Sequence, residues 1–65
     1  MKLKIYLMIN KIRLGEFSKI LGCTREHLSR IINGKIRASK RLAQDIERET
    51  HGKIKAQEVL DEYKG

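Results

Sequence analysis

The sequence predicts an all-α fold, a compact bundle of about five short helices that forms one domain over residues 1–65. Three observations lead to this prediction. Apolar residues recur at intervals of three and four in several segments, as they do on one face of a helix. The chain has no proline, and its five glycines punctuate these segments. With 65 residues the chain can bury only one modest core, so we expect a partner chain to add stability.

The central segment, residues 14–33, predicts two short helices joined by a tight turn. The first helix is expected at about 14–21 and the second at about 24–33. Gly22 can end the first helix in a left-handed conformation. Thr24 can then accept a backbone N–H as the N-cap of the second. The segment therefore predicts a helix-turn-helix.

Apolar spacing gives each of these two helices one face for packing. Phe17, Ile20 and Leu21 share a face of the first helix, and Leu28 and Ile31 share a face of the second. The outward face of the second helix carries Glu26, Ser29, Arg30 and Asn33, with Arg25 on its edge, and all of these side chains can form hydrogen bonds. A helix that lies in a DNA major groove needs such a face.

The spacing of Glu26 and Arg30 leaves two interpretations open. They lie at positions i and i+4, so they can pair with each other and leave fewer groups for bases. A paired Glu26 can also orient Arg30 toward a base, so pairing and reading are compatible.

The net charge of +7 is distributed unevenly along the chain. Residues 1–12 carry +3, residues 13–41 carry +6, and residues 42–65 carry −2. The positive charge therefore surrounds the predicted motif, as expected for a surface that binds a polyanion. The candidates for contact with a nucleic-acid backbone are Arg13, Lys19, Asn33, Lys35, Arg37, Lys40 and Arg41. The last four lie around a predicted helix N-terminus, which attracts phosphate.

Residues 2–11 predict an N-terminal helix with two apolar stripes on roughly opposite sides. One stripe holds Leu3, Tyr6 and Leu7, and the other holds Ile5, Met8 and Ile9. Both stripes could pack inside, or the second could form part of a dimer interface. A strand is a minor alternative, because Leu3, Ile5, Leu7 and Ile9 also alternate with a period of two.

Two further helices are expected at about 40–51 and 56–63. Ser39 can cap the first of them, and Gly52 can close it. Ile54 and Val59 can form a hydrophobic staple at the start of the second. The apolar face of this last helix either closes the core or contacts a second subunit, and it consists of Val59, Leu60 and Tyr63.

The segment 14–33 resembles the helix-turn-helix of the phage Cro and repressor family, the Xre-like regulators. Positions that are apolar in that family's pattern are occupied by Phe17, Leu21, Cys23, Leu28 and Ile31, and its small residue and glycine correspond to Ser18 and Gly22. The run LSRIINGK is especially typical. The similarity extends more weakly over nearly the whole chain. The chain departs from the pattern at Arg13, where the family often has Ser or Thr, and at Leu14, where it usually has a Gln that reaches the DNA backbone.

The resemblance implies a lambda-repressor-like DNA-binding domain and a small transcriptional regulator, a repressor that acts as a homodimer. The residues expected to read bases are Thr24, Arg25, Glu26, Ser29 and Arg30. Two copies would address half-sites about one helical turn apart. The competing hypothesis is the antitoxin half of a toxin–antitoxin pair, which binds DNA and a protein partner together. RNA binding lacks support, because only three residues are aromatic.

Catalytic, metal and cofactor sites are not expected. His27 and His51 lie far apart, and Cys23 is the only thiol, so no spacing resembles a zinc site. There is no glycine-rich phosphate loop for a nucleotide cofactor. A single cysteine fits a reducing cytoplasm. We find no signal peptide, and no segment approaches the roughly 20 apolar residues of a membrane span.

Overall fold

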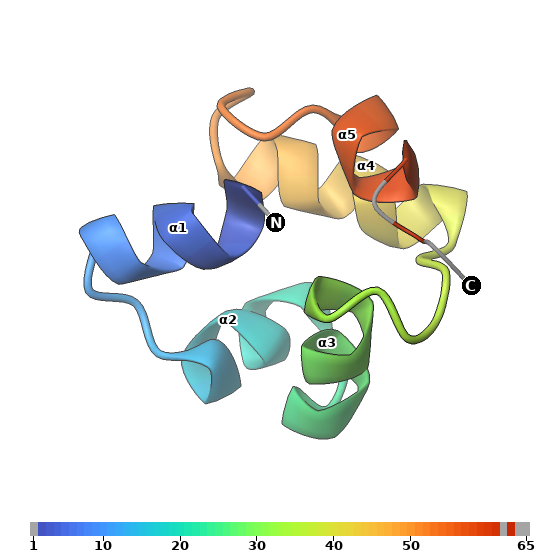
Figure 1. Ribbon diagram of the computed structural model, residues 1–65. Coiled ribbons are helices and arrows are strands. Elements are labelled where there is room, and N and C mark those ends of the chain that lie inside the picture. Colours follow the sequence, from blue (N-terminus) through green and yellow to red (C-terminus); the bar gives the residue numbers. More distant parts are fainter. Residues whose placement is uncertain (1, 62, 64–65) are drawn as a thin grey trace.

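The computed structural model describes residues 2–61 and 63, and within this part of the chain it contains five α-helices and no strand. The helices are α1 (Lys2–Ile9), α2 (Leu14–Leu21), α3 (Arg25–Ile32), α4 (Lys40–Glu49) and α5 (Ala56–Asp61). In Figure 1, α2 and α3 form the lower part of the molecule, and α1, α4 and α5 lie above them. The predicted all-α fold is confirmed, and α1 excludes the strand alternative for residues 2–11.

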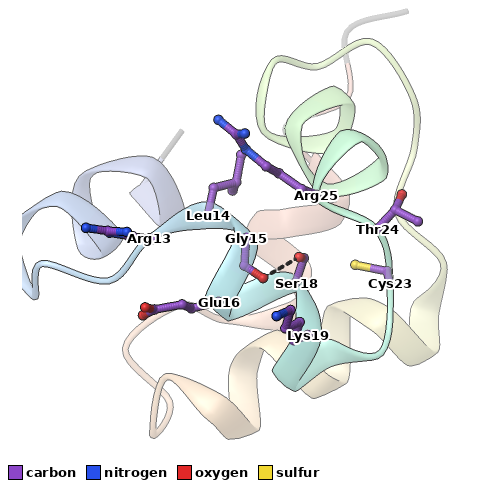
Figure 2. A pocket seen from close by; sticks show the side chains of 9 residues that line it. All are labelled: Arg13, Leu14, Gly15, Glu16, Ser18, Lys19, Cys23, Thr24 and Arg25. Carbon is purple, nitrogen blue, oxygen red and sulfur yellow. Dashed lines mark hydrogen bonds between the residues drawn. The ribbon is translucent and has the colours of Figure 1, made fainter.

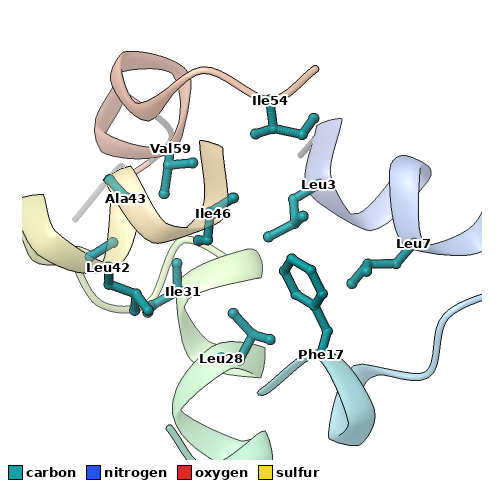
Figure 3. Close-up of a cluster of buried hydrophobic side chains, with 11 residues drawn as sticks. Leu3, Leu7, Phe17, Leu28, Ile31, Leu42, Ala43, Ile46, Ile54 and Val59 are labelled. Carbon is teal, nitrogen blue, oxygen red and sulfur yellow. The ribbon is translucent and has the colours of Figure 1, made fainter. Parts of the chain in front are cut away.

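Every helix contributes side chains to one apolar core (Figure 3). Its largest fully buried members include Leu3 of α1, Phe17 of α2, Leu28 of α3, Ile46 of α4 and Val59 of α5. Because these residues come from the whole length of the chain, no helix packs independently of the others. The core therefore fixes the position of α2 and α3 relative to the rest of the molecule.

The inner stripe of α1 is buried as predicted, whereas its second stripe is not. Leu3 and Leu7 lie in the core. Ile5, Met8 and Ile9 are 57%, 70% and 72% exposed. The alternative in which both stripes pack inside is therefore wrong.

Two further predictions about apolar residues are corrected. Ile20 is 58% exposed and does not share the packed face of α2. At about 100° per residue, this face is centred on Phe17, Ser18 and Leu21, which leaves Ile20 to one side. Val59 was predicted as a candidate for a subunit contact, but it is buried in the core. Leu60 packs partly against the same core, whereas Tyr63 is 39% exposed.

The predicted α3 is one residue too long at each end, and three other predicted helices also extend too far. α1 ends at Ile9, and the next turn closes with Lys11 in a left-handed conformation (φ 55°) and an Ile12 N–H to Leu7 carbonyl bond of 2.9 Å. α4 ends two residues before His51, which also has a φ of 55°. α5 ends at Asp61, and Glu62, which was predicted to continue it, lies outside the described residues.

The connection between α4 and α5 is organised by two polar side chains. Thr50 is fully buried, and its hydroxyl donates to the Ile46 carbonyl (2.8 Å) and accepts from the Ile54 N–H (3.1 Å). The Glu47 carboxylate accepts from the Ala56 N–H (2.8 Å), which satisfies a free donor at the start of α5. These bonds hold α5 against α4.

Candidate nucleic-acid interface

The turn between α2 and α3 is built by the residues that predicted it. Gly22 adopts the left-handed conformation (φ 78°), and its N–H donates to the Lys19 carbonyl at 3.1 Å. The Thr24 hydroxyl accepts from the His27 N–H at 3.1 Å and caps α3. Ser18 is buried, and its hydroxyl donates to the Gly15 carbonyl within α2. A small buried residue at this position lets α3 pack closely on α2.

The two sides of α3 differ sharply in exposure. Leu28 and Ile31 are buried in the core. The side chains predicted to read bases lie on the other side: Thr24, Arg25, Glu26 and Arg30 are exposed, and Ser29 is half-buried. α3 therefore presents one continuous polar surface to solvent.

Two hydrogen-bonded pairs of side chains lie on this surface, and the two members of each pair are four residues apart. The Arg30 guanidinium donates to the Glu26 carboxylate at 3.0 Å, with the two side chains 59% and 77% exposed. Asn33 donates to the Ser29 hydroxyl at a longer 3.4 Å. An exposed i, i+4 ion pair stabilises a helix by only about 0.3–0.5 kcal/mol. The predicted Glu26–Arg30 pairing is confirmed, and it is weak enough to open when a better partner approaches.

Arg25 takes a different direction from Arg30. A Cβ placed on Gly15 would lie 3.8 Å from the Arg25 Cδ, so the stem of Arg25 runs past the start of α2. Figure 2 shows its guanidinium extending beyond Leu14. The structure therefore separates Arg25 from the Glu26–Arg30 pair and brings it to the N-terminal end of α2.

An open depression of about 780 Å³ lies where α2 and α3 begin. Arg13, Lys19 and Arg25 line it and supply three positive charges, and Glu16 supplies one negative charge (Figure 2). Arg13 is the N-cap of α2 but makes no side-chain capping bond. The first-turn N–H groups of a helix have no intrahelical acceptor, so the positive end of α2 adds to the positive charge of this depression.

A second group of cations follows α3 along the chain. Lys35, Arg37, Lys40 and Arg41 are all exposed. The loop that carries the first two is held by Ala38, which is buried. The Ser39 hydroxyl accepts from the Leu42 N–H at 3.1 Å and caps α4, as predicted. α3 is therefore preceded and followed in the chain by exposed basic residues.

Lys4 lies next to α3, although the sequence did not predict it as part of the candidate interface. It lines a groove of about 310 Å³ between α1 and α3, together with Met8, Leu14, Ser29 and Asn33. Its charge was visible in the basic N-terminal third of the sequence. Its closeness to the end of α3 depends on how α1 packs, which no local pattern reveals.

Within residues 2–61 and 63, no group of three or more His, Cys, Asp or Glu side chains is arranged to hold a metal ion. Cys23 is half-buried, and burial raises the pKa of its thiol. The thiol therefore stays protonated at neutral pH and contributes to packing as a small apolar group. The described helices are all too short or too polar to span a membrane.

Comparison of the chain with protein-family models, with curated proteins and with solved structures gave no significant match.

Proposed function

We propose that the chain is a small Xre-like transcriptional regulator that binds double-stranded DNA in a sequence-specific manner as a homodimer. The observation that carries this proposal is the two-sided character of α3. Its apolar side is fixed in the core by Leu28 and Ile31, and its opposite side exposes Arg25, Glu26 and Arg30. A rigidly held helix with an exposed polar face suits insertion into the major groove.

Arg30 and Glu26 are the residues best suited to distinguish bases. A guanidinium can form two bonds to the major-groove edge of guanine, and a carboxylate can accept from cytosine N4. Their 3.0 Å ion pair holds both side chains in place before DNA binds. Ser29 is shorter and only half exposed, so it contributes less discrimination.

Phosphate contacts would fix the register of α3 on the duplex. The depression at the start of α2 offers Arg13, Lys19 and Arg25 to the phosphate backbone. Lys35, Arg37, Lys40 and Arg41 offer a second set near the start of α4. The family's usual Gln is replaced by Leu14, so the charge of Arg25, which lies beside Leu14, substitutes for that contact.

The mechanism we propose is occupancy of a promoter. A homodimer would read two half-sites about one helical turn apart and would prevent polymerase from binding. This function belongs in the cytoplasm, where a free thiol such as Cys23 stays reduced.

A binding titration tests the proposal. The purified chain is titrated with labelled duplex DNA from upstream of its own gene and with a scrambled duplex of equal length, at several salt concentrations. Saturable binding to the upstream duplex at protein concentrations that leave the scrambled duplex free is the expected result. Equal and steeply salt-dependent binding to both duplexes would reject sequence-specific reading of this DNA.

A second candidate function is that of a DNA-binding antitoxin. The exposed apolar side chains Ile5, Met8 and Ile9 favour it, because they offer a surface to another protein. Expression of the chain together with the product of its neighbouring gene tests this candidate. Co-purification of a stoichiometric complex is expected if the chain is an antitoxin, and separate elution of the two proteins would exclude that neighbour as its toxin.

A further inference from the structure

The outward face of α1 is an apolar surface that the fold leaves uncovered. Ile5, Met8 and Ile9 lie three and four positions apart, so they share one side of the helix. Their side chains are 57–72% exposed, while Leu3 and Leu7 on the other side are buried. A cluster of large apolar side chains in this state marks an interaction surface.

The basic residues around this face indicate which kind of partner surface can bind to it. Lys4 and Lys11 are exposed and lie before and after its three apolar residues in the chain, and the sequence has no acidic residue between positions 2 and 15. If two α1 helices met in an antiparallel manner, Lys4 of one copy would approach Lys11 of the other. Like charges placed opposite each other are destabilising, so a second α1 is a poor complement.

The C-terminal segment of the same chain has the complementary character. Positions 56–63 include three acidic residues and no basic residue, and Lys55 and Lys64 flank this window. Asp61 is exposed, and Tyr63 exposes 39% of its surface close by in the sequence. This segment therefore offers both an apolar side chain and negative charge to a basic, apolar surface.

We infer that the outward face of α1 binds the C-terminal segment of a second copy of the chain. The same contact made in return gives a closed two-fold dimer, in which each copy supplies one basic and one acidic surface. The inference rests on the homodimer of the proposed function and assigns its surfaces. In Figure 1, α1 and α5 both lie above α2 and α3. Ile5 and Ile9 do not line the groove that Met8 shares with Ser29 of α3 and with Asn33, its C-cap.

Two properties of the dimer follow from its composition. α1 and α5 have only eight and six residues, so the dimer is weaker than one with an interface of standard size. Part of the attraction joins exposed charges, so added salt weakens it further.

Sedimentation equilibrium of the full chain without DNA measures the self-association directly. Ile9→Glu is expected to raise the dimer dissociation constant by at least about tenfold. Ile20→Glu is the matched control, because Ile20 is 58% exposed on α2 and lies outside the proposed contact. It is expected to dimerise like the natural chain, and circular dichroism should show that both variants remain folded.

A charge exchange tests which segment lies opposite α1. Lys11→Glu and Asp61→Lys are each expected to weaken the dimer, and the double variant is expected to regain most of the lost affinity. If Lys11 and Asp61 do not contact each other across the dimer, the double variant should not regain affinity, because changes at two unrelated sites have additive effects.

The inference is overturned if the natural chain stays monomeric at all concentrations, if Ile9→Glu dimerises normally, or if the double variant is as weak as the single variants. Failure of DNA binding gives a different pattern. A monomeric chain that still discriminates between duplexes keeps the proposed function and rejects this interface. A dimer that is sensitive to Ile9→Glu but discriminates between no duplexes keeps the interface and rejects the function.

Discussion

Gly15 lies within α2 and Gly22 caps its C-terminal end, and a pair of alanine substitutions can separate their conformational requirements. Gly22 has a φ of 78°, and an added Cβ would lie in open space, so Gly22→Ala is penalised by the backbone alone. We expect a loss of about 1–2 kcal/mol in the free energy of unfolding. Gly15 is helical, and a Cβ there meets only the Arg25 stem at 3.8 Å. Gly15→Ala is therefore expected to gain about 0.5–1 kcal/mol.

Urea denaturation followed by circular dichroism measures both variants. If Gly22→Ala is as stable as the natural chain, the left-handed residue does not determine the turn. If Gly15→Ala is strongly destabilising, the approach of Arg25 to α2 is closer than the structure shows.

Arg30 is the residue on which sequence discrimination depends most in the proposed complex. Arg30→Ala is expected to reduce the preference for the specific duplex by about 1–3 kcal/mol. His27→Ala provides the control, since His27 is also exposed on α3 but is not among the residues proposed to read bases. Competition titrations with specific and scrambled duplexes measure the preference, and an unchanged preference in Arg30→Ala would remove this residue from the reading set.

At the scale of elements, the α4–α5 connection depends on the hydroxyl of Thr50. Thr50→Val keeps the volume but leaves the buried Ile54 N–H without its 3.1 Å acceptor. We expect a loss of about 1–3 kcal/mol in the free energy of unfolding. Thr50→Ser keeps the hydroxyl and is expected to lose about 0.8 kcal/mol for one buried methyl group. Thermal and urea unfolding compare the two, and equal stability of Thr50→Val and the natural chain would show that the hydroxyl is dispensable.

The accuracy of the sequence predictions also varies by element. α3 is one residue shorter at each end than predicted, with Thr24 and Asn33 as its caps. The bounds of α2 were predicted correctly, because Gly22 is a strong local signal for the end of a helix. The ends of α1 and α4 were not, because Lys11 and His51 adopt left-handed conformations that non-glycine residues seldom take. A local pattern cannot reveal a turn that tertiary packing stabilises.

In the candidate site, too, features set by local sequence were predicted and features set by tertiary packing were not. The polar side of α3 and the Glu26–Arg30 pair followed from helical spacing alone. The direction of Arg25 and the closeness of Lys4 to α3 did not, because each depends on the packing of one helix against another. Amphipathicity placed Val59 on an apolar face correctly, but it could not tell whether that face met the core or a second subunit.

At the scale of the whole molecule, exposed positive charge lies around α2, α3 and the start of α4. In the proposed complex, binding of DNA through these charges would release counterions, so we expect the affinity to fall as salt rises. Lys40→Ala is expected to weaken binding to all duplexes alike and to reduce the slope of log affinity against log salt by about 1. Lys53, exposed in the connection between α4 and α5, lies away from this region.

Lys53→Ala is therefore the control for the same measurement, because it removes an equal charge from the molecule. Its slope is expected to match that of the natural chain. If both variants reduce the slope equally, net charge rather than a defined surface governs the binding.

The burial of Leu3 has a consequence for how the protein is made. Figure 3 shows Leu3 pointing toward Ile46, which belongs to the later part of the chain, and Ile54 and Val59 complete the same core. On the ribosome, a nascent chain that ends after α3 already contains the whole of α3 but lacks these partners. The core is then complete only after α5 has emerged, so an incompletely synthesised copy does not hold α3 as the finished chain does.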